Sequence, residues 1–126
     1  MIPRYKAWDS WRKRMSVVDR IYIDTKGVRL YDDFGEYWRD FSDVELMQST
    51  GLKDKNGKEI FEKDILDYNG RKVIVKWHGS YASFIYEFVD ELQNRTTGWH
   101  PLYLSYYHFE IIGNSLENPE LLEVTE

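Results

Sequence analysis

The clearest alternation of apolar and polar side chains lies in the second half of the chain. Residues 71–77 alternate with a period of two, which is typical of a strand with one buried face. The turn signal Asn69-Gly70 precedes this strand and joins it to an earlier strand at 65–68. Residues 78–80 give another turn signal, and residues 81–89 alternate again. Three successive strands joined by short turns predict an antiparallel meander.

The N-terminal part predicts a small antiparallel sheet. Residues 3–8 alternate well enough for a first strand, which Asp9-Ser10 ends. A second apolar run is expected to form a strand that ends at Thr25-Lys26-Gly27, where Lys26-Gly27 supplies the turn. The period of two resumes at residues 28–31, so these residues are expected to complete a hairpin.

The centre of the chain carries the densest turn signal, Asp54-Lys55-Asn56-Gly57. Asn-Gly tolerates positive φ, so the backbone reverses there without strain. Residues 44–48, before the turn, are expected to form a strand. Residues 59–63, after it, are expected to form a tight turn or one helical turn.

Residues 32–43 are rich in both acids and aromatic side chains. The aromatic residues sit at spacings of three, one and three, which match one face of a helical turn; they are Phe34, Tyr37, Trp38 and Phe41. Gly35 and the acids suit a loop equally, so we expect a loop or a short helix. The aromatic side chains either cap the core from outside or form an acidic, aromatic contact surface for a basic partner.

The last third of the chain predicts less regular structure. Residues 90–101 are expected to form a longer connection, residues 102–107 a strand or a turn of helix, and residues 109–114 a closing strand. Asn118-Pro119 supplies an N-cap and a first helical residue, so a short final helix is expected from Pro119.

Together these elements predict a mainly β fold, of the β-rich α+β kind. We expect curled antiparallel sheets resembling a small SH3-like or other partly open barrel, with a short C-terminal helix. A chain of 126 residues has the size of one domain. Within a single domain 1–126, we expect a β-hairpin region at about 1–43 and a barrel-like region at about 44–126.

Composition supports a β-rich domain with aromatic clusters. Aromatic residues make up 17% of the chain, with ten tyrosines and five tryptophans, and such residues favour strands and interfaces. The chain has no cysteine, which excludes disulfides and thiol chemistry. No segment approaches the ~20 apolar residues of a membrane span, and no export signal is recognisable. We therefore expect a cytoplasmic protein that makes no membrane contact.

Charge is unevenly distributed around a formal net charge of −5. Residues 1–14 carry five basic residues and one acid, whereas residues 32–45 carry six acids and one basic residue. Such segregation either steers a charged partner or reflects ordinary solvated faces.

Three segments, in the same order along the chain, resemble the YopX family. They are residues 2–9 (IPRYKAWD), residues 46–60 (LMQSTGLKDKNGKEI) with Asp64-Ile65, and residues 112–122 (IGNSLENPELL). The family commonly has Glu-Gly-Asp where this chain has Glu62-Lys63-Asp64. Because lysine is unfavourable at positive φ, we expect no positive-φ turn at Lys63.

The resemblance implies a small protein of bacteriophage or prophage origin, present in a bacterial host cell, with a β-rich fold. It implies no activity, because the family is one of unknown function with no catalytic residues to transfer. The same segments also have structural explanations, since their glycines suit turns and their apolar residues suit a core.

Motifs for catalysis or metal binding are missing from the sequence. A calcium loop placed on Gly57 would have Leu52 at its first position and Lys63 at its last, where acids are needed. The three histidines lack metal-ligand spacing, and neither a Gly-x-Ser-x-Gly motif nor a phosphate-binding glycine loop occurs. We therefore expect a protein that is not an enzyme and has no cofactor or metal.

Binding suits the composition better. The possible interaction surface comprises Tyr37, Trp38, Phe41, Arg71, Lys72, Lys76 and Trp77. A non-catalytic protein-interaction module, with a host, phage or self partner, fits the excess of aromatic residues. The alternative is a small nucleic-acid-binding barrel that uses the basic residues of this set together with residues 12–14, although the net charge works against phosphate affinity. An acidic mimic of DNA would need denser acids than this chain carries.

Overall fold

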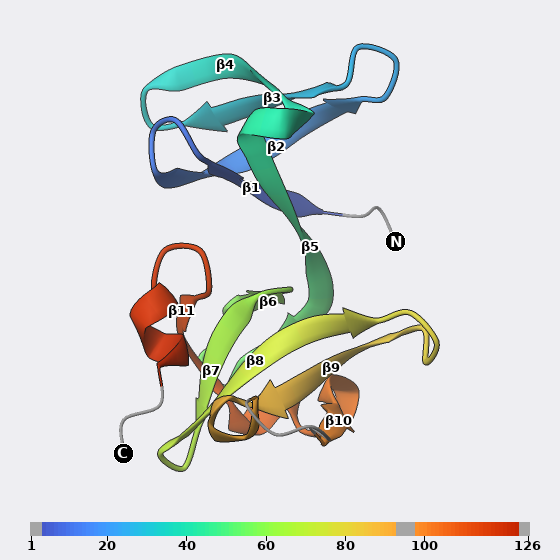
Figure 1. The fold of residues 1–126 in the computed structure, drawn as a ribbon, viewed down its shortest axis with the longest axis vertical. Helices are drawn as coiled ribbons and strands as arrows, with labels where there is room; N and C mark the ends of the chain where they lie inside the picture. Colours follow the sequence, from blue (N-terminus) through green and yellow to red (C-terminus); the bar gives the residue numbers. More distant parts are fainter. Residues whose placement is uncertain (1–3, 93–97, 124–126) are drawn as a thin grey trace. The chain divides into compact units, whose positions relative to one another are not determined.

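The computed structural model describes residues 4–92 and 98–123. The chain divides into two compact units, an N-terminal unit (Met1–Ser49) and a C-terminal unit (Thr50–Glu126). The two regions expected from the sequence, at about 1–43 and 44–126, meet a few residues before this boundary. Antiparallel strands dominate both units (Figure 1). The prediction of a mainly β fold is therefore confirmed, while the prediction of a single domain stays a prediction.

The described residues form eleven strands: β1 (Tyr5–Asp9), β2 (Arg14–Tyr22), β3 (Gly27–Asp32), β4 (Gly35–Asp40), β5 (Val44–Lys53), β6 (Glu59–Phe61), β7 (Asp64–Tyr68), β8 (Arg71–His78), β9 (Ser83–Phe88), β10 (Trp99–Pro101) and β11 (Glu110–Asn114). Five short 3₁₀ turns accompany them: η1 (Phe41–Asp43), η2 (Val89–Glu91), η3 (Leu102–Leu104), η4 (Tyr106–His108) and η5 (Pro119–Leu122). None of the helices in these ranges is long and apolar enough to cross a membrane.

In the N-terminal unit, strands β4, β3, β2, β1 and β5 lie side by side in this order, all antiparallel. The predicted strand at residues 3–8 and the predicted hairpin ending at 28–31 are both present, as β1 and as β2 with β3. Fully buried side chains from β1 and β3 form the core of this unit: Ala7, Val28 and Leu30. Residues two apart on β3 share this core because side chains alternate across a strand.

The interpretation of residues 32–43 as a loop or short helix is wrong. Residues 35–40 form the edge strand β4, which pairs along its whole length with β3, and only η1 after it is helical. Tyr37 and Trp38 therefore lie on opposite faces of a strand rather than on one helical face. Tyr37 and Phe41 pack against the core, whereas Trp38 is 39% exposed.

The C-terminal unit contains the predicted meander. Its five-stranded sheet has the order β10-β9-β8-β7-β11 (Figure 1), and Asn69 and Gly70 form the β7–β8 turn with φ of 50° and 88°. Buried residues on one side of this sheet and from the segments around it make the core: Ile60, Leu66, Val73, Val75, Tyr86, Leu102 and Phe109. Because β10 and β11 are open edges, this sheet does not close into a barrel.

A buried carboxylate fixes the predicted turn at residues 54–57. Asp54 Oδ1 accepts hydrogen bonds from the backbone N–H groups of Asn56 and Lys58, both at 2.9 Å, and Oδ2 accepts one from Ile111 N–H at 3.0 Å. Asp54 is only 5% exposed. Burial opposes its ionisation, yet these three N–H donors and the charge of Lys58 hold its pKa below the ordinary value.

Residues 59–63 differ from their prediction in two respects. Residues 59–61 form a strand, β6, beside the end of β5, so the expected turn or helical turn is wrong for them. Lys63 then adopts a φ of 70°, so the expectation that lysine would prevent a positive-φ turn is also wrong. Two backbone hydrogen bonds hold this turn, from Lys63 N–H to Val75 O and from Ser115 N–H to Lys63 O.

The segment just before residue 102 is more regular than its sequence predicts. The long connection predicted at 90–101 contains strand β10, which pairs with β9, while residues 93–97 of that prediction lie outside the described residues. Residues 102–107 fall in two 3₁₀ turns, and β11 follows as predicted. The final helix begins at Pro119 as expected, but it is a single 3₁₀ turn. The Asn118 side chain does not cap this turn; its Oδ1 accepts a hydrogen bond from the backbone N–H of Asn114 instead.

Candidate interaction surfaces

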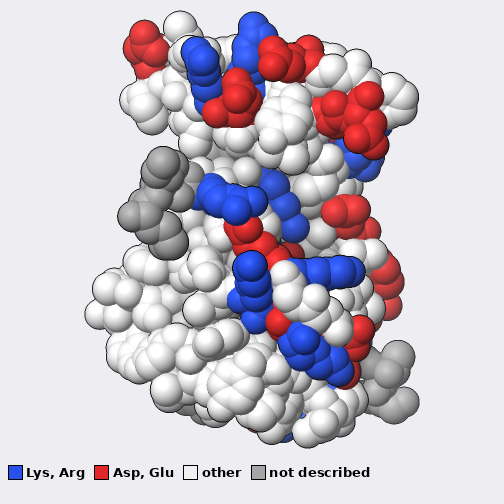
Figure 2. Space-filling model, turned by 180° about the vertical axis from the view of Figure 1, so that it is seen from behind, with Lys and Arg blue, Asp and Glu red and all other residues white. Residues whose placement is uncertain are grey.

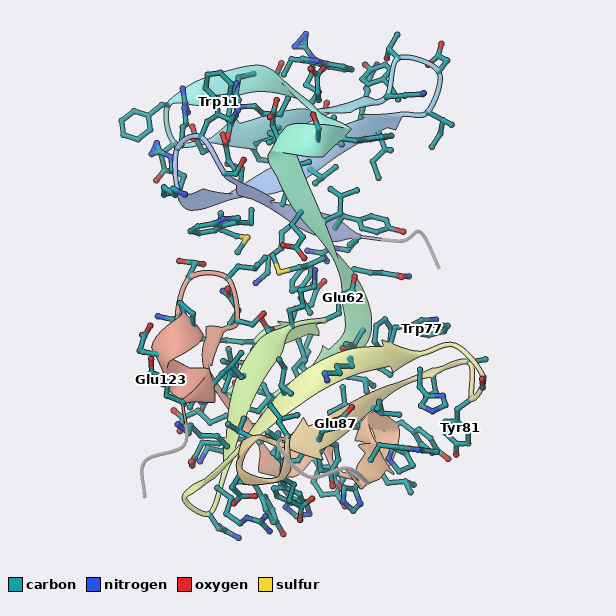
Figure 3. The ribbon with its side chains drawn as sticks, viewed as in Figure 1. Trp11, Glu62, Trp77, Tyr81, Glu87 and Glu123 are labelled. Atoms are coloured by element: carbon teal, nitrogen blue, oxygen red, sulfur yellow. The ribbon has the colours of Figure 1, made fainter. Side chains whose placement is uncertain are left out.

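Four large aromatic side chains gather on the C-terminal unit at the end of the β8–β9 hairpin. We call Trp77, Tyr81, Trp99 and Tyr103 the aromatic surface. Their exposed fractions run from 40% for Trp99 to 50% for Trp77. Trp77 and Tyr81 lie at this end of the hairpin (Figure 3). Figure 2 shows a broad field without charged side chains on the same side of the unit, at the lower left of that view.

Ring contacts hold the aromatic surface in a fixed arrangement. The Trp99 ring centroid lies 4.9 Å from that of Tyr81 and 4.7 Å from that of His78. Trp77 packs edge-on against Phe84 at 5.0 Å, its cross-strand partner. Distances of this size are typical of favourable aromatic pairs.

Polar contacts support the same arrangement. The backbone N–H of Tyr81 donates to His78 Nδ1 at 3.0 Å, which closes the turn that carries Tyr81. The hydroxyls of Tyr81 and Tyr103 lie 3.4 Å apart. This hydrogen bond with Tyr103 is the main cause of the raised pKa of Tyr81.

Only Trp77 of the aromatic surface was named from the sequence. Trp99 and Tyr103 come from β10 and η3, which reach Tyr81 because β10 pairs with β9. Nothing in the local sequence around Trp99 shows that it lies beside the β8–β9 turn. His100 itself stacks on Tyr86 with centroids 5.2 Å apart.

The basic residues predicted on β8 are divided between its two faces. Arg71 shares the face of the core residues Val73 and Val75, whereas Lys72 and Lys76 lie on the other face. Both lysines have an acidic neighbour on an adjacent strand. Lys72 lies opposite Asp67 in the β7–β8 pair, and Lys76 Nζ lies 3.4 Å from Glu87 Oε1 on β9.

Arg71 makes the best-defined ion pair of this set. Its guanidinium donates to both carboxylate oxygens of Asp90, at 2.8 and 3.2 Å, and lies 3.7 Å from the centroid of the Phe88 ring. The hydrogen bond from Arg71 is the main cause that holds the pKa of Asp90 below its usual value. These acids neutralise the cations that a phosphate backbone would need.

In the N-terminal unit, a buried aspartate organises the loop between β1 and β2. Asp9 is fully buried, and its Oδ1 accepts from Trp11 N–H at 2.9 Å and Arg12 N–H at 3.3 Å. Burial opposes ionisation of Asp9, but these N–H groups, the Tyr37 hydroxyl and the charge of Arg39 lower its pKa. The loop thus presents Trp11 to solvent with 72% of its side chain exposed.

The basic residues of this loop stack on aromatic rings instead of forming a free cationic patch. Arg12 lies 4.3 Å from the centroid of Tyr37, and Arg14 lies 4.7 Å from the centroid of Phe34. Both guanidinium groups also reach Asp32, at 3.1 and 3.4 Å. Such cation–π and ion-pair contacts compete with binding of a phosphate.

A small pocket of about 160 Å³ lies beside Trp11. Its lining residues are Trp11, Trp38, Arg39, Asp40 and Asp43.

Of the residues predicted as an interaction surface, only Trp38 lines this pocket, while Tyr37 and Phe41 pack on the core. The predicted surface residues Tyr37, Trp38 and Phe41 lie in the N-terminal unit, and Arg71, Lys72, Lys76 and Trp77 lie in the C-terminal unit. Trp11 was not singled out from the sequence.

The sequence model of the family described as YopX protein matches residues 4–123. The chain belongs to the YopX family. This match covers nearly the whole chain, including the segments between the three that carried the resemblance. It assigns no activity to the residues of either unit.

A solved structure is similar to this YopX chain over nearly its whole length. The crystal structure of protein EF1440 from Enterococcus faecalis is 30% identical in sequence, with a TM-score of 0.63. The similarity covers 98% of this chain and 99% of that protein. Among curated proteins, none matches this YopX chain. Within residues 4–92 and 98–123, no group of three or more histidine, aspartate or glutamate side chains is placed to hold a metal ion.

Proposed function

We propose that this YopX protein is a non-catalytic protein-interaction module of a bacteriophage or prophage, acting in the bacterial cytoplasm. Its contact surface is the aromatic surface of the C-terminal unit. The observation that carries the proposal is the cluster of Tyr81, Trp99 and Tyr103, whose side chains are 40–49% exposed yet contact one another. Trp77 packs on Phe84 at the same end of the hairpin.

Exposed tryptophan and tyrosine side chains are the residues that contribute most to binding at protein interfaces. A preformed cluster loses little side-chain freedom when a partner covers it, because ring contacts already restrict the rotamers. The charge-poor surroundings of the cluster (Figure 2) favour an apolar protein contact over an ionic one.

Nucleic-acid binding is the alternative, because bases also stack on exposed aromatic rings. The ion pairs of Arg71 with Asp90 and of Lys76 with Glu87 weigh against it, since both would have to break before a phosphate could bind. Salt separates the two: phosphate binding weakens steeply as salt rises, whereas an aromatic protein contact does not.

The first test uses the purified protein with the variants Trp99→Ala and Tyr103→Ala. Ile23→Ala is the matched control, because Ile23 is a 76% exposed apolar residue of the other unit. Sedimentation velocity over a concentration series measures self-association directly. Affinity capture from nuclease-treated bacterial lysate at low and high salt, followed by reconstitution with each purified candidate, measures a different partner.

We expect binding that survives high salt and weakens about tenfold or more in Trp99→Ala and Tyr103→Ala, as for residues at the centre of an interface. Ile23→Ala should bind like the wild type. Equal binding by all four proteins would refute the assignment to the aromatic surface. Binding of single-stranded DNA that disappears at high salt and in Arg71→Ala would support the alternative function.

A further inference from the structure

The pocket beside Trp11 combines two indole rings with two carboxylates, and it lies in the N-terminal unit, apart from the aromatic surface in sequence and in chemistry. Trp11 and Trp38 supply the rings, and Asp40 and Asp43 supply the carboxylates. Figure 3 shows Trp11 on its loop in this unit. We call this site the acidic indole pocket.

The walls of the acidic indole pocket are held from several directions. The Asp9 carboxylate fixes the loop that carries Trp11. The Asp43 carbonyl accepts from both the backbone N–H and the side-chain hydroxyl of Ser10, at 3.1 and 2.7 Å, which ties η1 to the same loop. The Trp38 indole N–H donates to Asp40 Oδ1 at 3.1 Å, so one ring and one carboxylate of the pocket are joined directly.

The charge that remains in the pocket is negative. Arg39 lines it, and its guanidinium lies 5.8 Å from the centroid of the Trp11 ring. Its nitrogens bond outside the two pocket carboxylates: Nε lies 3.2 Å from Asp9 Oδ2, and Nη1 donates to the Trp38 carbonyl at 2.9 Å. Asp9 thus neutralises Arg39, and no described lysine or arginine forms an ion pair with Asp40 or Asp43. The carboxylates of Asp40 and Asp43, beside the two indole rings, therefore remain for a cationic ligand.

Such a site selects an organic cation. The face of an indole attracts a cation more strongly than other aromatic rings do, and carboxylates add direct charge complementarity. An anion would be repelled by Asp40 and Asp43, and a neutral apolar group would leave both carboxylates without a new partner. The volume of about 160 Å³ accommodates one amino-acid side chain and excludes a folded element.

We propose that the acidic indole pocket binds the side chain of a lysine or arginine presented by a partner protein. Trp11 covers the alkyl stem and faces the cation, and Asp40 and Asp43 pair with its charge. This binding role explains why Trp11, which is 72% exposed, stands on a loop that a fully buried aspartate holds in place. This site does not depend on the aromatic surface, so each can fail in experiment while the other stands.

The test is a titration of the full-length ¹⁵N-labelled protein with blocked amino acids, followed by NMR. N-acetyl-lysine-N-methylamide and its arginine counterpart are the probes, and N-acetyl-norleucine-N-methylamide is the control because it has the same stem without the charge. We expect saturable shifts of the Trp11 and Trp38 indole N–H signals and of the Asp40 and Asp43 amides with the two cationic probes alone.

Two variants locate the site. Asp43→Asn and Trp11→Ala should each weaken binding of the lysine probe about two- to fivefold, which is the size of a single exposed charge or cation–π contact. Asp33→Asn removes an exposed acid of the same unit outside the pocket and should leave binding unchanged. Unchanged dispersion of the amide spectrum checks that each variant is folded.

Three results would overturn the proposal. Equal shifts with the norleucine control would show that charge plays no part. Shifts confined to signals outside the pocket, or full binding by Asp43→Asn and Trp11→Ala, would place the cation elsewhere. Absence of saturable shifts with both cationic probes would show that the pocket does not recognise this class of side chain.

Discussion

The indole ring of Trp38 packs directly on the backbone of Gly27, across the β3–β4 pair. A Cβ atom added at Gly27 would lie 2.0 Å from Trp38 Cζ2, far inside van der Waals contact. The positive φ of this turn belongs to its neighbour, Lys26, at 54°. The glycine is therefore needed for close approach of a ring, a role that the turn pair Lys26-Gly27 does not reveal in the sequence.

Gly27→Ala is expected to destabilise the protein because the ring of Trp38 must move to admit the new methyl group. Overpacking of this kind typically costs about 1–3 kcal/mol in the free energy of unfolding. Urea unfolding followed by tryptophan fluorescence measures the change. Gly79→Ala is the control, because a Cβ there meets nothing within 4 Å.

A double-mutant cycle tests the cause. In a Trp38→Leu background, which removes the indole, Gly27→Ala should cost clearly less than in the wild type. Equal costs in the two backgrounds would mean that Trp38 is not what excludes a side chain at position 27.

Sequence signals that span only a few residues were sufficient to predict several turns and hairpins. The Asn69-Gly70 hairpin needed only its two turn residues and the alternation after them, and both lie at positive φ. The turn at 54–57 was equally local, with Gly57 N–H bonded to Asp54 O at 3.0 Å. Such turns are encoded by the residues that form them.

Elements that depend on distant pairing were not predictable. The aromatic spacing in residues 32–43 matched a helix, but pairing with β3 made residues 35–40 an edge strand. Asp54 looked like an ordinary turn residue, whereas its Oδ2 bonds Ile111, which is 57 positions further on. In both cases tertiary contacts override what a short window of sequence indicates.

The candidate sites show the same division. Trp77 stood out at the end of an alternating strand, but Trp99 reaches His78 and Tyr81 at the end of the β8–β9 hairpin only through the β9–β10 pair. Trp11 and Asp43 are far apart in sequence, and the acidic indole pocket forms because η1 is bonded to the loop after β1. A list of suggestive residue types could not specify which of them meet.

Asp54 is expected to be a major contributor to stability in the C-terminal unit. Asp54→Asn replaces one acceptor oxygen by an N–H₂ group, which leaves at least one buried backbone N–H without its partner. The expected loss is about 1–3 kcal/mol in the free energy of unfolding. Glu120→Gln, at an exposed position of the same unit, is the control with the same loss of charge and should change stability little.

The pH dependence of this loss follows from the lowered pKa of Asp54. Burial opposes ionisation, but the N–H donors prevail, so the carboxylate stabilises the folded state fully above the ordinary pKa of 3.8. That stabilisation is lost as pH falls through the folded-state pKa, below 3.8. The difference in urea midpoint between wild type and Asp54→Asn should therefore shrink as pH falls below this value. A difference that stays constant or grows in acid would contradict this account.

The Tyr81–Tyr103 contact is expected to be visible in a titration. The hydrogen bond with Tyr103 raises the pKa of Tyr81 above its ordinary value of 10.0, so Tyr81 stays protonated to higher pH than an isolated tyrosine. NMR of protein labelled with ¹³C at tyrosine Cζ measures each ionisation separately. Tyr103→Phe should return the Tyr81 pKa toward its ordinary value, and an unchanged titration would show that the two hydroxyls do not meet in solution.

Lys63 occupies a turn position where the chain would be more stable with glycine. Its φ of 70° places a Cβ in the left-handed region, which costs roughly 1–2 kcal/mol for a residue with a side chain. The larger flexibility of unfolded glycine offsets part of this gain, by about 0.5–1 kcal/mol. Lys63→Gly is therefore expected to raise the free energy of unfolding by up to about 1 kcal/mol, as judged from urea unfolding.

Lys63→Ala is the matched control, because it also removes the side-chain contacts of Lys63 but keeps the Cβ. Both variants keep the backbone hydrogen bonds to Val75 and from Ser115, so the stability of Lys63→Gly relative to Lys63→Ala measures the backbone strain less the flexibility cost of unfolded glycine. A glycine variant no more stable than the alanine variant would mean that the strain at Lys63 does not exceed the flexibility cost of glycine.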